Sequence, residues 1–219
     1  MTLSVEEFLL PLFPLPNLVF FPQTRIPLHI FEPRYRQMVG DALESDEQIG
    51  MILLKPGWES AYYGSPAVYA YGTIGHIEQA VKFDDGRYNI LVHGTTRFRI
   101  LDWISQDPYR VARVVTAPER ESSPMQAYAQ REWLVDLSRR YIEFLPGQVH
   151  VPELATVSLD SLTNALIMSL DLPAEDKQRL LEVDDVLTRA EKVGTEIESR
   201  IGNLNFLSPY RKETDPSMN

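Results

Sequence analysis

Two histidines and a glutamate in the middle of the chain have the residue types of a metal site. His76 and Glu78 stand in one alternating run, and His93 stands in the next. The Asp-Asp-Gly-Arg stretch at residues 84–87 predicts a hairpin that sets Glu78 opposite His93, with His76 diagonal to it. Two imidazoles and a carboxylate are the ligands of non-haem iron and zinc sites. A solvated polar strand face with a Glu–His pair is the simpler interpretation, and we prefer it because the sequence shows no outer-shell support for a metal.

Three arginines and a tryptophan could form a small platform for single-stranded RNA. Arg97, Arg99 and Arg110 could share the face of Trp103 on a second predicted hairpin, whose turn lies at residues 105–108. The overall charge opposes this hypothesis, because 21 Lys and Arg against 31 Asp and Glu leave a net charge of -10 that repels polyanions. We therefore prefer a charged strand face that covers the tryptophan by cation–π contact, and we do not expect nucleic acid as a partner.

Four aromatic residues fall in a segment that glycines and a proline mark as a loop. They are Trp58, Tyr62, Tyr63 and Tyr69, and the segment contains Gly57, Gly64 and Pro66. Aromatic side chains in a loop either pack on their own domain or form an exposed patch that binds apolar segments of a partner. We prefer packing, because solitary surface aromatics are common. The alternative stays open and makes these four residues candidate partner-binding residues.

Motifs of several common enzyme classes are absent from the sequence. It contains no cysteine, no Gly-x-x-x-x-Gly-Lys-Ser/Thr phosphate loop, no Gly-x-Ser-x-Gly elbow and no His-Glu-x-x-His pattern. These absences argue against a nucleotide site of this type and against the common serine hydrolase and zinc protease sites, and no cofactor is expected. The most apolar stretch, residues 8–21, is interrupted by Pro11, Pro14 and Pro16 and follows two glutamates. We therefore expect a cytoplasmic protein with no membrane partner.

The apolar pattern changes near residue 117. Before it, alternating runs rich in β-branched and aromatic residues predict strands, and beyond it apolar residues recur at helical spacing. This order predicts an α+β fold with a β-rich domain over residues 1–117, a helical bundle over 118–207 and a flexible tail over 208–219. The prolines of the first 33 residues predict short extended pieces near sheet edges, followed by a helix at 34–43. Later helices are expected at 124–144, where Ser123 and Gln126 form a capping box, and at 159–170, 173–182 and 186–201.

Several stretches together resemble the N-terminal substrate-binding domain of the Lon protease family. The first are Leu-Pro-Leu-Phe-Pro-Leu at residues 10–15 and Ile-Pro-Leu-His-Ile-Phe-Glu-Pro-Arg-Tyr-Arg-Gln-Met at 26–38. Residues 72–77, 93–100, 109–114 and 162–181 continue the resemblance in order, over roughly the first 205 residues. Gln23 departs from the pattern, because the family often has glycine there, and its presence predicts that no positive φ is needed.

The resemblance implies a PUA-like, mixed or antiparallel barrel-like β-domain followed by a C-terminal helical subdomain. The family motifs in this chain are expected to keep the fold: Phe31, Glu32, Pro33, Arg34, Tyr35, Gly72, Gly75 and Phe98. It also implies noncatalytic binding of unfolded or degron-bearing protein segments, in a groove between the β-domain and the helices or along the aromatic loop. An ATPase or protease is a further partner that the resemblance suggests, since nothing here matches the ATPase module or the Ser–Lys peptidase module of Lon. RNA binding and metal-dependent catalysis remain the alternatives.

Overall fold

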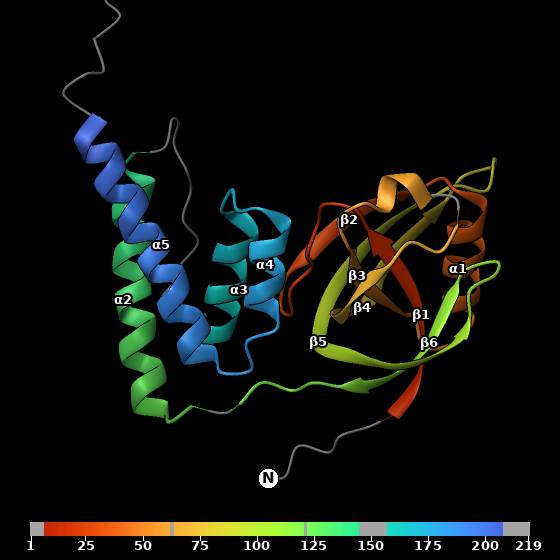
Figure 1. The fold of residues 1–219 in the computed structure, drawn as a ribbon, viewed down its shortest axis with the longest axis horizontal. Helices are drawn as coiled ribbons and strands as arrows, with labels where there is room; N and C mark the ends of the chain where they lie inside the picture. Colours follow the sequence, from red (N-terminus) through yellow and green to blue (C-terminus); the bar gives the residue numbers. More distant parts are fainter. Residues whose placement is uncertain (1–6, 62–63, 121, 145–156, 208–219) are drawn as a thin grey trace, which may run out of the picture.

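The computed structural model describes residues 7–61, 64–120, 122–144 and 157–207. A barrel-like ring of strands stands beside a group of helices (Figure 1). The strands are β1 (Glu7–Leu15), β2 (Arg25–Ile30), β3 (Gln48–Leu54), β4 (Val68–Lys82), β5 (Tyr88–Ser105) and β6 (Arg110–Thr116). This arrangement confirms the predicted α+β class with a barrel-like β-region first and helices afterwards.

The sheet closes through its longest strand. The strand order is β2-β5-β4-β3-β1-β6, and β5 also pairs with β6, so five strands form a ring with β2 attached outside it. β5 has 18 residues and pairs with β4 along Tyr88–Arg99 and with β6 along Phe98–Ser105. The β1–β3 pair is parallel and the other pairs are antiparallel. Closure removes most exposed strand edges and gives a stiff scaffold.

The proline-rich start of the chain forms one long interior strand, β1, and one short edge strand, β2. The prediction of short pieces near sheet edges is therefore confirmed for β2 and was wrong for β1. β1 has nine residues and lies between β3 and β6. It pairs with β6 from Glu7 to Leu12 and with β3 from Leu12 to Leu15, so the two ladders overlap only at Leu12. Pro11 and Pro14 therefore each stand where only one neighbouring strand is paired, which lets an interior strand accept residues without an N–H.

The hairpin between β4 and β5 exists, but its register differs from the predicted one. Residues 84–86 form the loop, and Gly86 adopts a φ of +82°, as three-residue hairpin loops require. A β-bulge follows in β4 at Glu78, and beyond it His76 lies opposite His93. The predicted pairing of Glu78 with His93 was therefore wrong, because the loop length and the bulge each shift the ladder.

Gln23 adopts the left-handed backbone conformation that its residue type argued against. Its φ is +60°, and its N–H donates to the carbonyl of Gly94 at 2.8 Å. The bond joins the segment before β2 to β5 and holds the backbone in a region that non-glycine residues seldom occupy. The expectation of no positive φ at this position was wrong.

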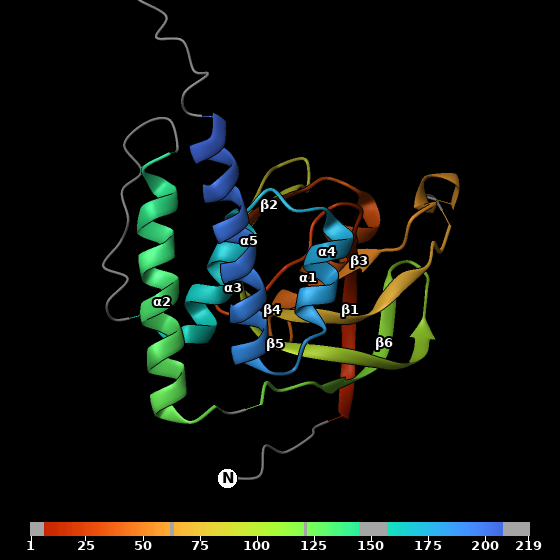
Figure 2. The same cartoon turned by 60° about the vertical axis from the view of Figure 1, so that its left-hand side comes forward.

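The helices lie on two sides of the barrel. α1 (Pro33–Leu43) covers the barrel on the side away from the helical group formed by α2 (Pro124–Ile142), α3 (Leu159–Ser169), α4 (Ala174–Leu181) and α5 (Val186–Leu207) (Figure 1). The start of α2 follows its predicted cap, since the Ser123 side chain accepts from the N–H of Gln126. α3 and α4 lie between the barrel and the two longer helices, which run side by side (Figure 2). None of the helices in the described ranges is long and apolar enough to span a membrane.

The barrel and the helical group share one hydrophobic cluster. Val19, Phe21 and Leu53 from the barrel side pack with buried residues of the helices, namely Leu137, Ile167, Leu170, Leu181, Val193, Ile197 and Ile201. Hydrogen bonds also join the two parts. The Asn164 side chain donates to the carbonyl of Pro22, and the Gln178 side chain donates to that of Tyr71, each at 3.1 Å. The two parts therefore form a continuous body, and a domain boundary at residue 117 stays a prediction.

Candidate functional site

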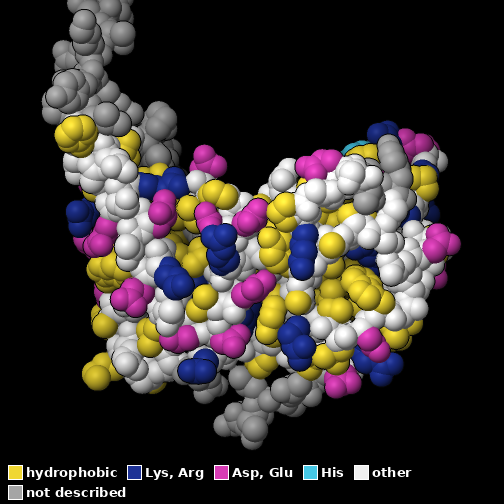
Figure 3. Space-filling view, viewed as in Figure 1, with side chains coloured by type: hydrophobic (Ala, Val, Ile, Leu, Met, Phe, Trp, Pro, Cys, Tyr) yellow, Lys and Arg dark blue, Asp and Glu magenta, His cyan; other side chains and the backbone are white. Residues whose placement is uncertain are grey.

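A groove lies between the loop after β3 and the start of α4. Its volume is about 570 Å³, and Figure 3 shows the surface hollowed between the helical group and the barrel. The lining residues come from three segments of the chain: Pro16, Asn17, Leu53, Leu54, Pro56, Gly57, Trp58, Glu59, Pro173, Ala174, Glu175, Asp176 and Arg179. Such a groove is large enough to hold several side chains of an extended segment.

Each wall of the groove follows from local sequence. β3 ends at Leu54, and the Lys-Pro-Gly sequence that follows turns the chain into the short 3₁₀ helix η1 (Trp58–Ala61), which carries Trp58. On the other side, Pro173 precedes α4, where its fixed φ suits a helix start. Leu53 is 2% exposed and Leu54 is 5% exposed, so the base of the groove is fixed by the barrel.

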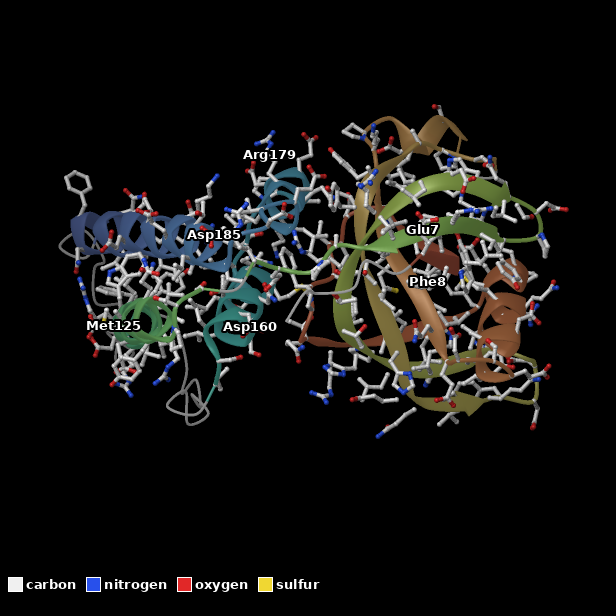
Figure 4. All side chains as sticks on the ribbon, turned by 90° about the horizontal axis from the view of Figure 1, so that it is seen from below. Glu7, Phe8, Met125, Asp160, Arg179 and Asp185 are labelled. Carbon is white, nitrogen blue, oxygen red and sulfur yellow. The ribbon has the colours of Figure 1, made fainter. Side chains whose placement is uncertain are left out.

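The charged residues of the groove make its rim acidic. The lining contains three acidic residues, Glu59, Glu175 and Asp176, and one basic residue, Arg179. The Arg179 guanidinium pairs with its own helix, at 2.5 Å from Asp176 and 3.8 Å from Glu175. Figure 4 shows the Arg179 side chain projecting outward from α4. The groove therefore combines an apolar base with a negative rim, which suits apolar segments flanked by basic residues.

The aromatic loop residues have separate surroundings. Trp58 lines the groove and is half-buried. Tyr69 is half-buried against the shared hydrophobic cluster, and Lys55 Nζ lies 5.7 Å from its ring centre. Burial raises the pKa of Tyr69, and the charges of Glu175 and Glu182 add to that shift. Tyr62 and Tyr63 lie outside the described residues.

Arg97 is part of the molecule's interior and not of a surface face. It is 0% exposed, and its guanidinium donates to the carbonyls of Leu181 at 2.8 Å and Val183 at 3.2 Å. It also donates to the carbonyl of Pro118 at 3.3 Å and to the Asp184 carboxylate at 2.9 Å. Arg97 therefore ties β5 to the segment between α4 and α5.

The three arginines proposed as an RNA platform do not share one face, so that prediction was wrong. Arg99 is exposed on β5, whereas Arg110 is only 7% exposed at the start of β6. The Arg110 guanidinium lies 5.7 Å from the ring centre of Trp103, which confirms one cation–π contact. With Arg97 enclosed between the barrel and the helices, the positive groups lie in three different environments.

The three candidate metal ligands do not converge either. Both carboxylate oxygens of Glu78 accept bonds of 2.8 Å from the Arg25 guanidinium, and this hydrogen bonding is the main cause that lowers the pKa of Glu78. His93 lies 3.6 Å from Glu78, while His76 lies 3.7 Å from Glu47 instead. Within the ranges that the structure describes, no three His, Asp or Glu residues are arranged to hold a metal ion.

The residues of the family motifs lie in two places. A Cβ on Gly72 would come within 2.4 Å of the Met51 carbonyl, and one on Gly75 within 2.4 Å of Val92, while Phe98 is fully buried beside them. Phe31, Glu32, Arg34 and Tyr35 line a second cavity at the junction of β2 and α1, next to Pro33 at the first position of α1, and Tyr35 is also buried in the hydrophobic core. Phe31 is 60% exposed, which does not fit a role in keeping the fold.

Sequence reasoning found Trp58 but missed most of the groove around it. Pro16 and residues 173–176 are far from Trp58 in the sequence: Pro16 comes beside it through the β1–β3 pairing, and residues 173–176 through the packing of α4 on the barrel. The Pro-Ala-Glu-Asp sequence at 173–176 gives a helix start and no sign of a binding wall. The available signal was the cluster of apolar and proline residues at the ends of β1 and β3.

Known proteins of one family match almost the whole chain. The family described as the ATP-dependent protease La (LON) substrate-binding domain matches residues 9–199. Lon protease 2 of Myxococcus xanthus is 30% identical over 191 residues, which cover 84% of this chain and 23% of that protein. Lon protease 2 of Herpetosiphon aurantiacus is 29% identical over 219 residues, with 95% and 26% covered. The chain thus spans about a quarter of the length of these curated relatives.

Solved structures agree with this relationship. The crystal structure of a Lon N-terminal domain protein from Xanthomonas campestris is similar with a TM-score of 0.61 at 27% identity, covering 85% of this chain and 96% of that one. The N-terminal domain of the Mycobacterium avium complex Lon protease has the same fold, with a TM-score of 0.64 at 18% identity and coverages of 87% and 98%. The fold and the match over residues 9–199 show that the chain belongs to the family of Lon substrate-binding domains.

Proposed function

We propose that the groove between η1 and α4 binds apolar segments of unfolded or degron-bearing proteins and holds them without cleaving them. The observation that carries the proposal is the groove itself, about 570 Å³ in volume, with buried leucines at its base and Trp58 on one wall. Unfolded segments expose apolar side chains, and a preformed surface can bind them at low ordering cost. Membership of the Lon substrate-binding domain family supports this class of ligand.

The connection between barrel and helices supports the same proposal. The groove has one wall on each part, so its shape depends on their relative position. A shared hydrophobic cluster and the side-chain bonds of Arg97, Asn164 and Gln178 hold that position. A groove whose walls are fixed loses little conformational freedom when it binds.

The acidic rim gives the proposed ligand a charge preference. Three carboxylates and one arginine line the groove, and the arginine already pairs with two of those carboxylates. Lysine or arginine beside an apolar stretch would meet this rim favourably, whereas acidic segments would be repelled. An ATPase or protease that processes the held segment is the second partner class of this proposal.

Binding of fluorescently labelled, denatured casein, followed by anisotropy, tests the proposal. Trp58→Ala should weaken binding about tenfold, because an aromatic anchor at the centre of an apolar contact contributes strongly. Tyr128→Ala is the control, since Tyr128 is an aromatic residue that is 62% exposed on α2 and does not line the groove. Equal loss in both variants, or no loss in Trp58→Ala, would overturn the assignment of the groove.

The salt dependence of the same binding separates apolar recognition from binding of a polyanion. Contacts with an apolar segment should change little between low and moderate salt, whereas contacts with phosphates weaken steeply. A steep decline of casein affinity with salt would contradict the proposal that the apolar base supplies the affinity.

A further inference from the structure

A second cavity adjoins the groove and has a different chemistry. Its volume is about 160 Å³, close to the size that accommodates one benzene-sized group. The lining residues are mostly apolar and come from the ends of β1 and β3, the β2–α1 junction and the start of β6: Phe13, Pro14, Leu15, Pro16, Phe31, Glu32, Arg34, Tyr35, Leu54, Pro66 and Arg110. Pro16 and Leu54 line both cavities, so the two are continuous along the surface.

Arg110 is the unusual residue of this cavity. It is only 7% exposed, and its contact within the described part of the chain is the ring of Trp103, with no carboxylate at ion-pair distance. Two other buried arginines each meet an acidic residue, since Arg97 pairs with Asp184 and Arg189 pairs with Glu119. Burying a cation without an anion is costly, so such a group is normally paired.

The rest of the lining leaves the positive charge of Arg110 uncompensated. Glu32 and Arg34 form an ion pair at 2.9 Å and so balance each other. The first turn of α1 contributes Arg34 and Tyr35, and the start of a helix carries partial positive charge. Burial is the main cause that lowers the pKa of Arg110; the nearby Tyr35 raises it, and the charge of Arg34 lowers it. An anion beside this guanidinium would therefore be favoured.

We propose that this cavity binds the C-terminal residue of a protein segment held in the adjoining groove, with the α-carboxylate on Arg110 and an apolar side chain among the surrounding rings and prolines. The inference rests on the proposed function, because the groove supplies the rest of the segment. A chain end with an apolar last residue carries a carboxylate and an apolar group on the same carbon, which matches one buried guanidinium inside one small apolar cavity. A carboxylate can also accept two parallel hydrogen bonds from one arginine guanidinium, and this pairing fixes its orientation.

The wild-type protein can test this proposal with two forms of one peptide. A short labelled peptide that carries lysine before an apolar stretch and ends in leucine is made with a free carboxylate and as the C-terminal amide. The acid should bind about tenfold more tightly than the amide, because the amide cannot form the charged hydrogen bonds with Arg110. Equal affinities of the two forms would overturn the proposal.

Variants assign any such preference to Arg110. Arg110→Gln should bind the acid and the amide equally, while Arg99→Gln, which removes an exposed arginine from the paired strand, should keep the preference. Phe31→Ser changes a side chain that is 60% exposed and should weaken both forms without removing the preference. A preference that survives in a folded Arg110→Gln protein would contradict the assignment.

The same experiment separates this proposal from the broader function. If the acid and the amide bind equally and both compete with denatured casein, the groove binds segments and the carboxylate site is wrong. If neither peptide nor casein binds, the proposed function fails as well. If octanoate displaces the acid peptide at lower concentration than unlabelled peptide does, the cavity serves small carboxylic acids and the chain-end proposal is overturned.

Discussion

Arg97 and Arg110 lie on the paired strands β5 and β6 and are both more than nine-tenths buried, yet their surroundings are opposite. Arg97 lies at the junction of barrel and helices, where three carbonyls and a carboxylate accept its hydrogen bonds. Arg110 lies in a cavity at the β2–α1 junction, with an aromatic ring and no anion. The contrast teaches that a buried cation that pairs with a carboxylate and carbonyls of its own chain holds structure, whereas one without an anion is available to a ligand.

The largest effect should follow from removing the arginine of the junction. Arg97→Met leaves the carbonyls of Leu181 and Val183 without their donor, and it breaks the link between β5 and the segment before α5. We expect the free energy of unfolding to fall by about 3–5 kcal/mol, measured by urea denaturation.

Arg99→Met is the control for this variant, since it makes the same change at an exposed position of the same strand. It should alter the free energy of unfolding by less than about 0.5 kcal/mol. Similar losses in the two variants would contradict the structural role assigned to Arg97.

A smaller effect is expected at Asp185, which caps α5 at the same junction. Its carboxylate accepts from the Thr188 hydroxyl at 2.6 Å and from the N–H of Leu187 at 3.3 Å, and these bonds lower its pKa. Asp185→Ala should lower the free energy of unfolding by about 1 kcal/mol at neutral pH.

The pH dependence of that loss follows from the direction of the pKa shift. A carboxyl whose pKa is depressed in the folded state contributes its full stability above the unfolded pKa, about 3.9, and loses it as the pH falls through the folded pKa. The difference between wild type and Asp185→Ala should therefore shrink in acid below about pH 4. A difference that stays constant down to pH 2 would show that the carboxylate charge is not its source.

A gain in stability is expected at Gln23, beside the Pro22 carbonyl that receives Asn164 at the junction. Its φ of +60° suits glycine better than glutamine. Gln23→Gly should raise the free energy of unfolding by about 0.5 kcal/mol, because relief of strain exceeds the added chain entropy of the unfolded state. A loss of stability in thermal unfolding would show that the glutamine side chain contributes more than its backbone costs.

The smallest effect on stability should come from the arginine of the cavity. Arg110→Gln removes a charge that pairs with no carboxylate of the described residues, and it keeps a polar group at the cavity surface. The free energy of unfolding should change by less than about 0.5 kcal/mol, although the preference for a free chain end should disappear. A loss as large as that of Arg97→Met would erase the contrast between the two regions.

Much of the fold could be predicted because its signals are local. Pro33 and the apolar spacing after it predicted α1, and the turn at residues 84–87 predicted the β4–β5 hairpin. Ser123 and Gln126 predicted where α2 begins. The strand register could not be predicted, because the bulge at Glu78 has no distinctive residue pattern.

The candidate site was less predictable, since it depends on contacts between distant segments. Arg97 meets Leu181 and Asp184, more than eighty residues away in the sequence, and its alternating strand pattern looked like that of an exposed residue. The groove needs α4 packed beside the end of β3, and the second cavity needs β6 beside α1. The spacing of residues along the chain does not indicate either of these contacts.

Hydrogen–deuterium exchange of the protein with and without denatured casein tests the central claim most directly, because it locates the bound segment without any substitution. The account predicts slower exchange on binding at residues 53–59 and 173–179, the two walls of the groove, with no change in the exposed strand segment at 99–105. Protection confined to residues 99–105, or none at the two walls while casein is bound, would contradict it.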